Sequence, residues 1–130
     1  MGIFTYNVQR KNKQRYHADA IYTCGQFDKK VIGYVNKCSH VSSVVAPMFN
    51  VELGLGNDNA VSTEGFNYKN VYATELIGPL FVRNPYLLQY IINTLYSQKG
   101  EELKMLPDMS VQIKAYDAAL AELEAMKQEK

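Results

Sequence analysis

The chain has 130 residues, of which 47% are hydrophobic and 21% charged, with a formal net charge of +1. These values are typical of one globular domain with a real core and exclude bulk disorder. The near-neutral charge gives no general reason to expect nucleic acid as a partner, and no apolar run approaches the roughly 18 residues of a membrane span. We therefore expect a single domain over residues 1–130, without a cofactor, in a soluble cytoplasmic protein.

The first three-quarters of the chain has the alternating pattern of β-strands. The predicted strands cover residues 3–9, 16–24, 30–36, 48–55 and 66–76. The turn residues at 25–28 make the second and third of these the clearest hairpin. Polar segments at 10–15 and 56–65 are predicted as connections.

Helical spacing replaces this pattern near residue 84. Two helices are predicted, over about 85–99 and 109–128. Asn84 is expected to cap the first, Pro85 is a favoured first helical residue, and Gly100 is a natural stop. Asp108 or Ser110 is expected to open the second helix. Antiparallel or mixed strands over residues 3–76, followed by two helices, predict an α/β or α+β fold.

Few residues could carry metal or nucleophilic chemistry. The candidates are His17, Cys24, Cys38 and His40. Cys38-Ser39-His40 lacks the paired spacing of a zinc site, so no metal site is expected. Cys38 and His40 could face the same way as a thiol and its base. A single disulfide is the other possibility, but two free structural thiols are favoured.

Three other features have a functional and a structural interpretation. Gly54-Leu55-Gly56 begins a Gly-rich loop, but no helix follows, so a turn with positive φ is favoured over a phosphate cradle. The basic segment 10–15 (RKNKQR) could bind an anion or nucleic acid, but without stacking aromatic residues beside it a solvated turn is favoured. Glu64 and Glu75 are acid–base candidates only if the fold brings them together.

Five short motifs occur in order along residues 31–92. They are VIGYVN from Val31, GLGN from Gly54, EG and YKNV from Glu64, ATELIGPL from Ala73, and RNP from Arg83. This ordered set resembles the C-terminal half of class I glutamine amidotransferase domains. The branch is the cobyric-acid-synthase type, which includes the amidotransferase subunit of lipid II isoglutaminyl synthase. The matching family positions are Gly54, Gly56, Asn57, Glu64, Gly65, Tyr68, Asn70, Thr74, Gly78, Pro79, Asn84 and Pro85.

The resemblance implies a mechanism. In this family a cysteine on a sharp turn attacks the glutamine amide, and a histidine acts as general base. The ammonia passes to a synthetase-like, Mur-ligase-like partner that amidates a cell-wall precursor.

Two departures bear on that chemistry. The family's cysteine motif normally precedes the region resembled here, and neither Cys24, His17 nor His40 takes a matching position. Ile77 stands at the position of the catalytic histidine, and isoleucine cannot accept a proton.

We expect the C-terminal portion of an amidotransferase-like domain, catalytically inactive on its own. It would be a fragment, one half of a split protein, or a rearranged oligomer. It would associate with an N-terminal half, with a synthetase-like partner or with itself. A non-catalytic interaction module, or an unrelated α+β binding protein, is the alternative.

Overall fold

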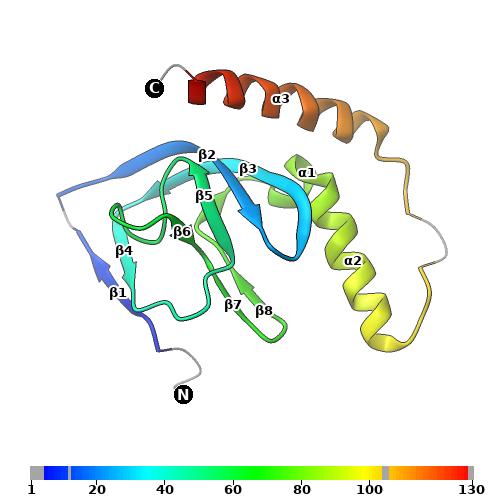
Figure 1. The fold of residues 1–130 in the computed structure, drawn as a ribbon, viewed down its shortest axis with the longest axis horizontal. Coiled ribbons are helices and arrows are strands. Elements are labelled where there is room, and N and C mark those ends of the chain that lie inside the picture. Colours follow the sequence, from blue (N-terminus) through cyan, green and yellow to red (C-terminus); the bar gives the residue numbers. More distant parts are fainter. Residues whose placement is uncertain (1–4, 12, 104–105, 129–130) are drawn as a thin grey trace. The chain divides into compact units, whose positions relative to one another are not determined.

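The computed structural model describes residues 5–11, 13–103 and 106–128 (Figure 1). Strands come first and helices last, so the fold is α+β, in agreement with the predicted class. The chain divides into two compact units, Met1–Gly78 with the strands and Pro79–Lys130 with the helices. All strand pairings between described residues are antiparallel.

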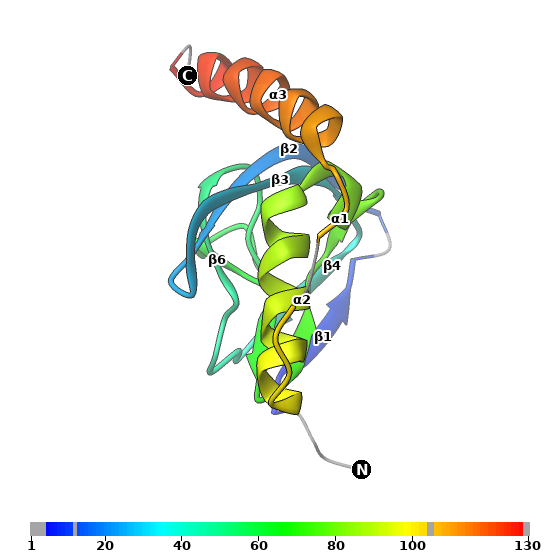
Figure 2. The same cartoon turned by 90° about the vertical axis from the view of Figure 1, so that its right-hand side faces the viewer.

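The strand unit is built on one five-stranded sheet with the order β6-β5-β2-β3-β9. Its members are β2 (Tyr16–Cys24), β3 (Phe27–Lys37), β5 (Phe49–Leu53), β6 (Thr63–Glu64) and β9 (Leu76–Ile77). Two small ribbons accompany it. One pairs β1 (Asn7–Arg10) with β4 (Ser39–Ser42), and the other pairs β7 (Phe66–Tyr68) with β8 (Val71–Ala73). Figure 2 shows β2 and β3 running together as the longest strands of the sheet.

The predicted hairpin is confirmed as β2 and β3. Its register runs from Tyr16 opposite Lys37 to Cys24 opposite Phe27, with one shift near Tyr22. The turn is shorter than predicted, because β3 already begins at Phe27. Consecutive residues of β2, from Ala20 to Tyr22, are fully buried, so both faces of this strand are covered in its second half.

Other strand predictions need correction. The segment 66–76 is not one strand, because a turn at Lys69, with φ of 55°, folds it into the β7–β8 hairpin before β9 begins. The predicted loop 56–65 ends in β6, where Glu64 pairs with Phe49. The strand predicted over 48–55 is shorter, since Gly54 ends it with the expected positive φ, 99°.

The start of the chain also differs from its prediction. The strand expected over 3–9 is observed at Asn7–Arg10. Residues 3 and 4 lie outside the described part of the chain. The short strand β4 was not predicted.

The helical unit has α1 (Leu80–Arg83), α2 (Pro85–Lys99) and α3 (Ser110–Gln128). The two long helices confirm the prediction, and Gly100 ends α2 in the left-handed conformation. The Asp108 carboxylate accepts a hydrogen bond from the Ser110 backbone N–H, 2.9 Å away, at the start of α3. No helix in the described ranges is long and apolar enough to cross a membrane.

The side-chain cap predicted for Asn84 is wrong. Asn84 stands before α2, but its side chain makes no cap hydrogen bond to that helix. Its amide Nδ2 instead donates to the carbonyl of Leu80, 2.9 Å away. The unpredicted turn α1 supplies this acceptor just before α2, which draws the side chain backward along the chain.

Candidate functional site

A cluster of buried polar side chains lies in the strand unit. Glu64 is 0% exposed, Asn57 4% and Lys37 6%. Charged side chains are almost never buried this deeply unless they are paired. The three come from β6, from the loop after β5 and from the last position of β3, so the cluster joins separate parts of the sheet.

Lys37 is at the centre of this cluster. Its Nζ donates to the carbonyls of Gly56 and Asn57, at 2.5 and 3.0 Å, and to Glu75 Oε2 at 2.5 Å. The second carboxylate oxygen of Glu75 accepts from Ser39 Oγ at 3.0 Å. All three ammonium protons therefore have acceptors, and the ion pair ties β3 to two loops.

Glu64 makes the second set of contacts. Its Oε2 accepts from Thr74 Oγ1 at 2.8 Å, and its Oε1 accepts from the Glu75 backbone N–H at 2.6 Å. Burial raises the pKa of Glu64, and these two hydrogen bonds only partly offset that effect. Tyr22, whose hydroxyl donates to the Leu55 carbonyl, also has its pKa raised by burial and then by Glu64.

Asn57 and two glycines complete the arrangement. The Asn57 amide exchanges two hydrogen bonds with the Gly65 backbone: Nδ2 donates to the carbonyl at 3.1 Å, and Oδ1 accepts from the N–H at 2.9 Å. Beside it, a Cβ atom on Gly56 would lie 2.3 Å from the Val61 carbonyl oxygen and 2.6 Å from that of Thr63. The GLGN motif therefore needs glycine at Gly56 because two backbone carbonyls approach it closely.

Gly56→Ala is expected to lower the free energy of unfolding by about 2–3 kcal/mol, because backbone, not a flexible side chain, must move to admit the methyl group. Gly25→Ala is the matched control, since nothing lies within 4 Å of the added Cβ there. Urea unfolding followed by circular dichroism measures both variants. Equal stability of the two variants would contradict the close approach at Gly56.

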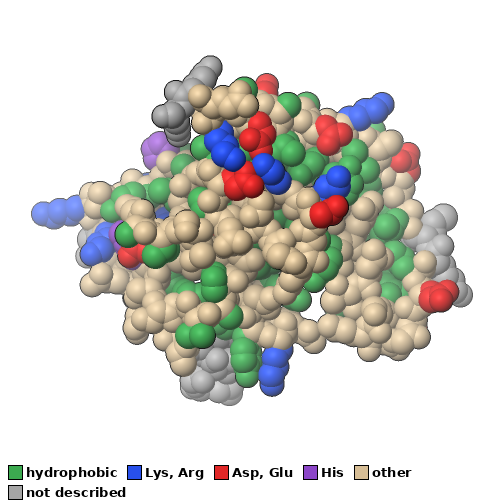
Figure 3. All heavy atoms as spheres, viewed as in Figure 1, with side chains coloured by type: hydrophobic (Ala, Val, Ile, Leu, Met, Phe, Trp, Pro, Cys, Tyr) green, Lys and Arg blue, Asp and Glu red, His purple; other side chains and the backbone are tan. Residues whose placement is uncertain are grey.

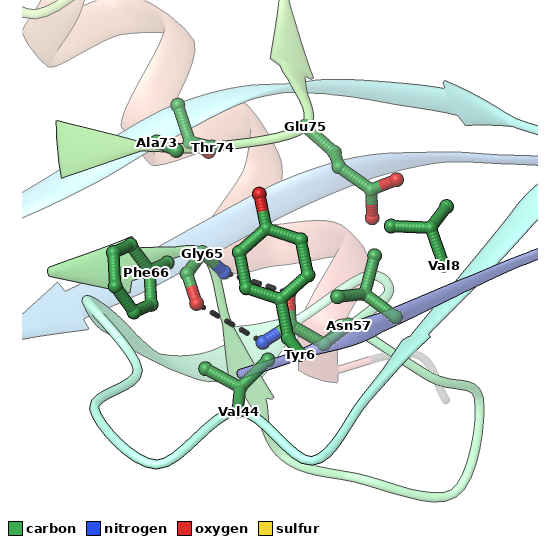
Figure 4. Close-up of a pocket in the computed structure, with 10 residues that line it drawn as sticks. Tyr6, Val8, Val44, Asn57, Gly65, Phe66, Ala73, Thr74 and Glu75 are labelled. Atoms are coloured by element: carbon green, nitrogen blue, oxygen red, sulfur yellow. Dashed lines mark hydrogen bonds between the residues drawn. The ribbon is translucent and has the colours of Figure 1, made fainter. Parts of the chain in front are cut away.

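A cavity of about 170 Å³ opens beside the cluster. Figure 4 shows the Asn57–Gly65 pair at its wall and the Glu75 carboxylate on the other side of Tyr6. Its lining is mostly apolar and consists of Tyr6, Val8, Val41, Val44, Asn57, Gly65, Phe66, Ala73, Thr74 and Glu75. The described lining residues include no histidine, cysteine or serine, so they offer no thiol, imidazole or serine hydroxyl for catalysis.

The structure brings some of the predicted site residues together and separates others. Asn57, Gly65 and Thr74 line the cavity, and Glu64 is bonded to Thr74. The remaining positions of the strand unit lie elsewhere: Gly54 in the turn after β5, Tyr68 and Asn70 exposed on the β7–β8 hairpin, and Gly78 after β9 with φ of 97°. Pro79, Asn84 and Pro85 belong to the helical unit, where Asn84 and Pro85 are buried.

The position that the motif resemblance assigns to the catalytic histidine is on the short strand β9. Ile77 lies opposite Tyr34 of β3 and is 47% exposed. Glu64 and Glu75, the two carboxylates that the sequence suggested, do lie together, as general acid–base catalysis requires. Their oxygens are already engaged by Thr74, Ser39, Lys37 and backbone, which is the pattern of a structural network.

The other candidates take structural positions. Cys24 and Cys38 are free thiols, as expected, and Cys24 is buried. His17 stacks on Tyr34, whereas His40 Nδ1 lies 2.8 Å from Asp58 Oδ1. The hydrogen bond to His40 lowers the pKa of the Asp58 carboxyl. No group of three metal-binding side chains occurs in the described part of the chain.

The sequence analysis did not identify Lys37 as a site residue, although the alternation of β3 indicated that its side chain faces the core. Val31 and Val35 face the core, and Lys37 continues the same alternation. A lysine in such a position must find buried acceptors. No comparable signal identified Ser39 or Asp58, because their partners are distant in the sequence.

No protein-family model matches the chain. It is 27% identical over 108 residues to the GatD subunit of lipid II isoglutaminyl synthase (glutamine-hydrolyzing) from Streptococcus pneumoniae, which covers 81% of this chain and 42% of that protein. The Staphylococcus aureus GatD subunit is 25% identical over 100 residues, 77% of this chain and 40% of its own length. The similarity inferred from the motifs is thus confirmed, and the chain spans about two-fifths of the curated relatives it matches.

Proposed function

We propose that this chain carries the C-terminal part of a GatD-like glutamine amidotransferase scaffold and does not hydrolyse glutamine on its own. In this proposal it belongs to the amidation of a cell-wall precursor, where it acts through a protein partner. The similarity to two GatD subunits supports the biochemical setting. The buried network of Lys37, Glu64 and Asn57 supports a scaffold role, since two of its members, Asn57 and Glu64, are family-motif positions and the network holds loops together.

The proposed inactivity rests on the side chain at the family's histidine position. Ile77 has no lone pair with which to take a proton from a nucleophile. Neither histidine of the chain is a ready substitute. His17 stacks on Tyr34, and His40 is paired with Asp58 outside the residues that line the cavity.

A partner is part of the proposal because the matched relatives are named as subunits of a synthase. The partner would be a synthetase-like, Mur-ligase-like protein or the complementary half of the amidotransferase domain. One feature of the strand unit fits such a role. β9, at one end of the five-stranded sheet, pairs with β3 at only two positions, Tyr34–Ile77 and Val35–Leu76. The end of a sheet presents backbone groups to which a strand of a partner can add.

The second candidate is a non-catalytic module that assembles with itself, for which the same end of the sheet could supply the pairing surface. Sedimentation velocity separates the two: a concentration-dependent dimer of the isolated chain favours self-assembly, and a monomer favours a different partner.

Ammonia release from glutamine tests the inactivity directly. We expect the isolated chain to give the rate of a blank without protein, because no general base stands at Ile77. The complete S. pneumoniae synthase that contains GatD is the positive control in the same assay. Glutamine-dependent ammonia release that disappears in Cys24→Ser or Cys38→Ser would contradict the proposal.

A further inference from the structure

A concavity of about 300 Å³ lies between β1 and β2, beside Cys38 in the β3–β4 connection. The lining residues are Arg10, Lys11, Lys13, Gln14, Arg15 and Cys38. Figure 3 shows Lys and Arg side chains at the left edge of the view, where Figure 1 has the connection from β1 to β2.

The charges of this concavity are unbalanced. Four of its six described lining residues are cationic and none is acidic. Acidic partners do accompany other lysines, as in the Lys30–Glu52 and Lys37–Glu75 pairs. No ion pair between described residues includes Arg10, Lys11 or Lys13. Like charges held close together repel, so an anion in the concavity relieves that repulsion.

The concavity is held in place by three hydrogen bonds. The Lys11 backbone N–H donates to the Cys38 carbonyl at 2.7 Å, and the Gln14 N–H donates to the Lys11 carbonyl at 3.3 Å. Arg15 Nε donates to Asn36 Oδ1 at 2.6 Å, which fixes the direction of this guanidinium. Its terminal N–H groups remain as donors for a ligand. Because the backbone is held at Lys11 and Gln14, these parts of the site lose less conformational freedom when a ligand binds.

We propose that this concavity binds a phosphate-bearing anion. Arginine guanidinium groups match the oxygens of phosphate in two-pronged geometry, and lysines add point charges. Four cations suit a multiply charged oxyanion such as a pyrophosphate group better than a single carboxylate. The chemistry is the same for a soluble phosphate ester and for a phospholipid headgroup. The inference does not depend on the proposed amidotransferase role.

Titration calorimetry with inorganic pyrophosphate at about 150 mM salt tests the proposal. We expect Arg10→Gln and Lys13→Gln each to raise the Kd by about fivefold or more, because each removes one cation from the concavity. Lys114→Gln on α3 is the matched control, since it changes the net charge equally at an exposed position that does not line the concavity. The control is expected to change the Kd by less than about twofold.

Cys38 provides a second readout that needs no variant. It lines the concavity and is partly exposed, whereas the buried Cys24 is an internal reference. Pyrophosphate is expected to slow alkylation of Cys38 by about fivefold or more as it fills the space over the thiol, and to leave Cys24 unchanged. Phosphatidylcholine vesicles with about one-fifth phosphatidic acid separate a lipid source from a soluble one.

Three results would overturn the inference. The first is no binding of either pyrophosphate or the vesicles at this salt concentration. The second is an equal loss of affinity in Lys114→Gln and Lys13→Gln, which would show only a net-charge effect. The third is displacement of pyrophosphate by acetate at lower concentration than by phosphate, which would assign the concavity to carboxylates.

Discussion

Replacing Lys37 with methionine is expected to lower the free energy of unfolding of this chain by about 3–4 kcal/mol. The ammonium makes three hydrogen bonds, and the Lys37 side chain is 5% exposed. The variant leaves the Gly56 carbonyl and Glu75 Oε2 without this donor, whereas the Asn57 carbonyl keeps the Val41 backbone N–H at 2.9 Å. An unpaired buried acceptor loses its water without compensation. Glu75 keeps a quarter of its side chain exposed, which places the cost at the lower end for a broken buried pair.

Lys30→Met is the matched control for this variant. Lys30 also pairs with a glutamate, Glu52, at 2.7 Å, but its side chain is about a third exposed. Exposed ion pairs contribute about 1 kcal/mol or less. Urea unfolding of both variants, followed by circular dichroism, should therefore separate them by about 2 kcal/mol or more. Equal losses would mean that the Lys37 network does not hold the strand unit together.

Much of the fold could be predicted from short-range signals. The β2–β3 hairpin has alternation on both strands and turn residues between them, and α2 has proline at its start and glycine at its end. Each of these signals lies within a few residues of the element it specifies. The turn at Lys69 had a weaker signal, because Asn70 is its one turn-forming residue and a lysine, not a glycine, takes the left-handed conformation.

The candidate site was harder to predict because its contacts join residues that are far apart in the sequence. Lys37 is 38 residues from Glu75, and Ser39 is 36 residues from the same carboxylate. Motif resemblance located Asn57, Glu64 and Gly65 in advance. The two approaches therefore complement each other, since the motifs give the positions and the structure gives their bonds.

We propose that this chain has a GatD-like scaffold in which Ile77 takes the place of the general base. Loss of a positioned general base typically costs about 10²–10⁴-fold in rate. If Ile77 is the missing element, then Ile77→His should restore that factor once the rest of the amidotransferase is supplied. The similarity to S. pneumoniae GatD, 108 residues long, defines a chimera in which to make this test.

In the chimera, this chain's 108 matched residues replace the corresponding part of S. pneumoniae GatD within the complete synthase. Thermal unfolding first shows that the Ile77 and Ile77→His forms are equally folded. The measurement is glutamine-dependent ammonia release by each form. We predict that the Ile77 form gives no release above the blank and that Ile77→His raises it by about 100-fold or more. Equal rates in the two folded forms, whether both active or both inactive, would contradict the account.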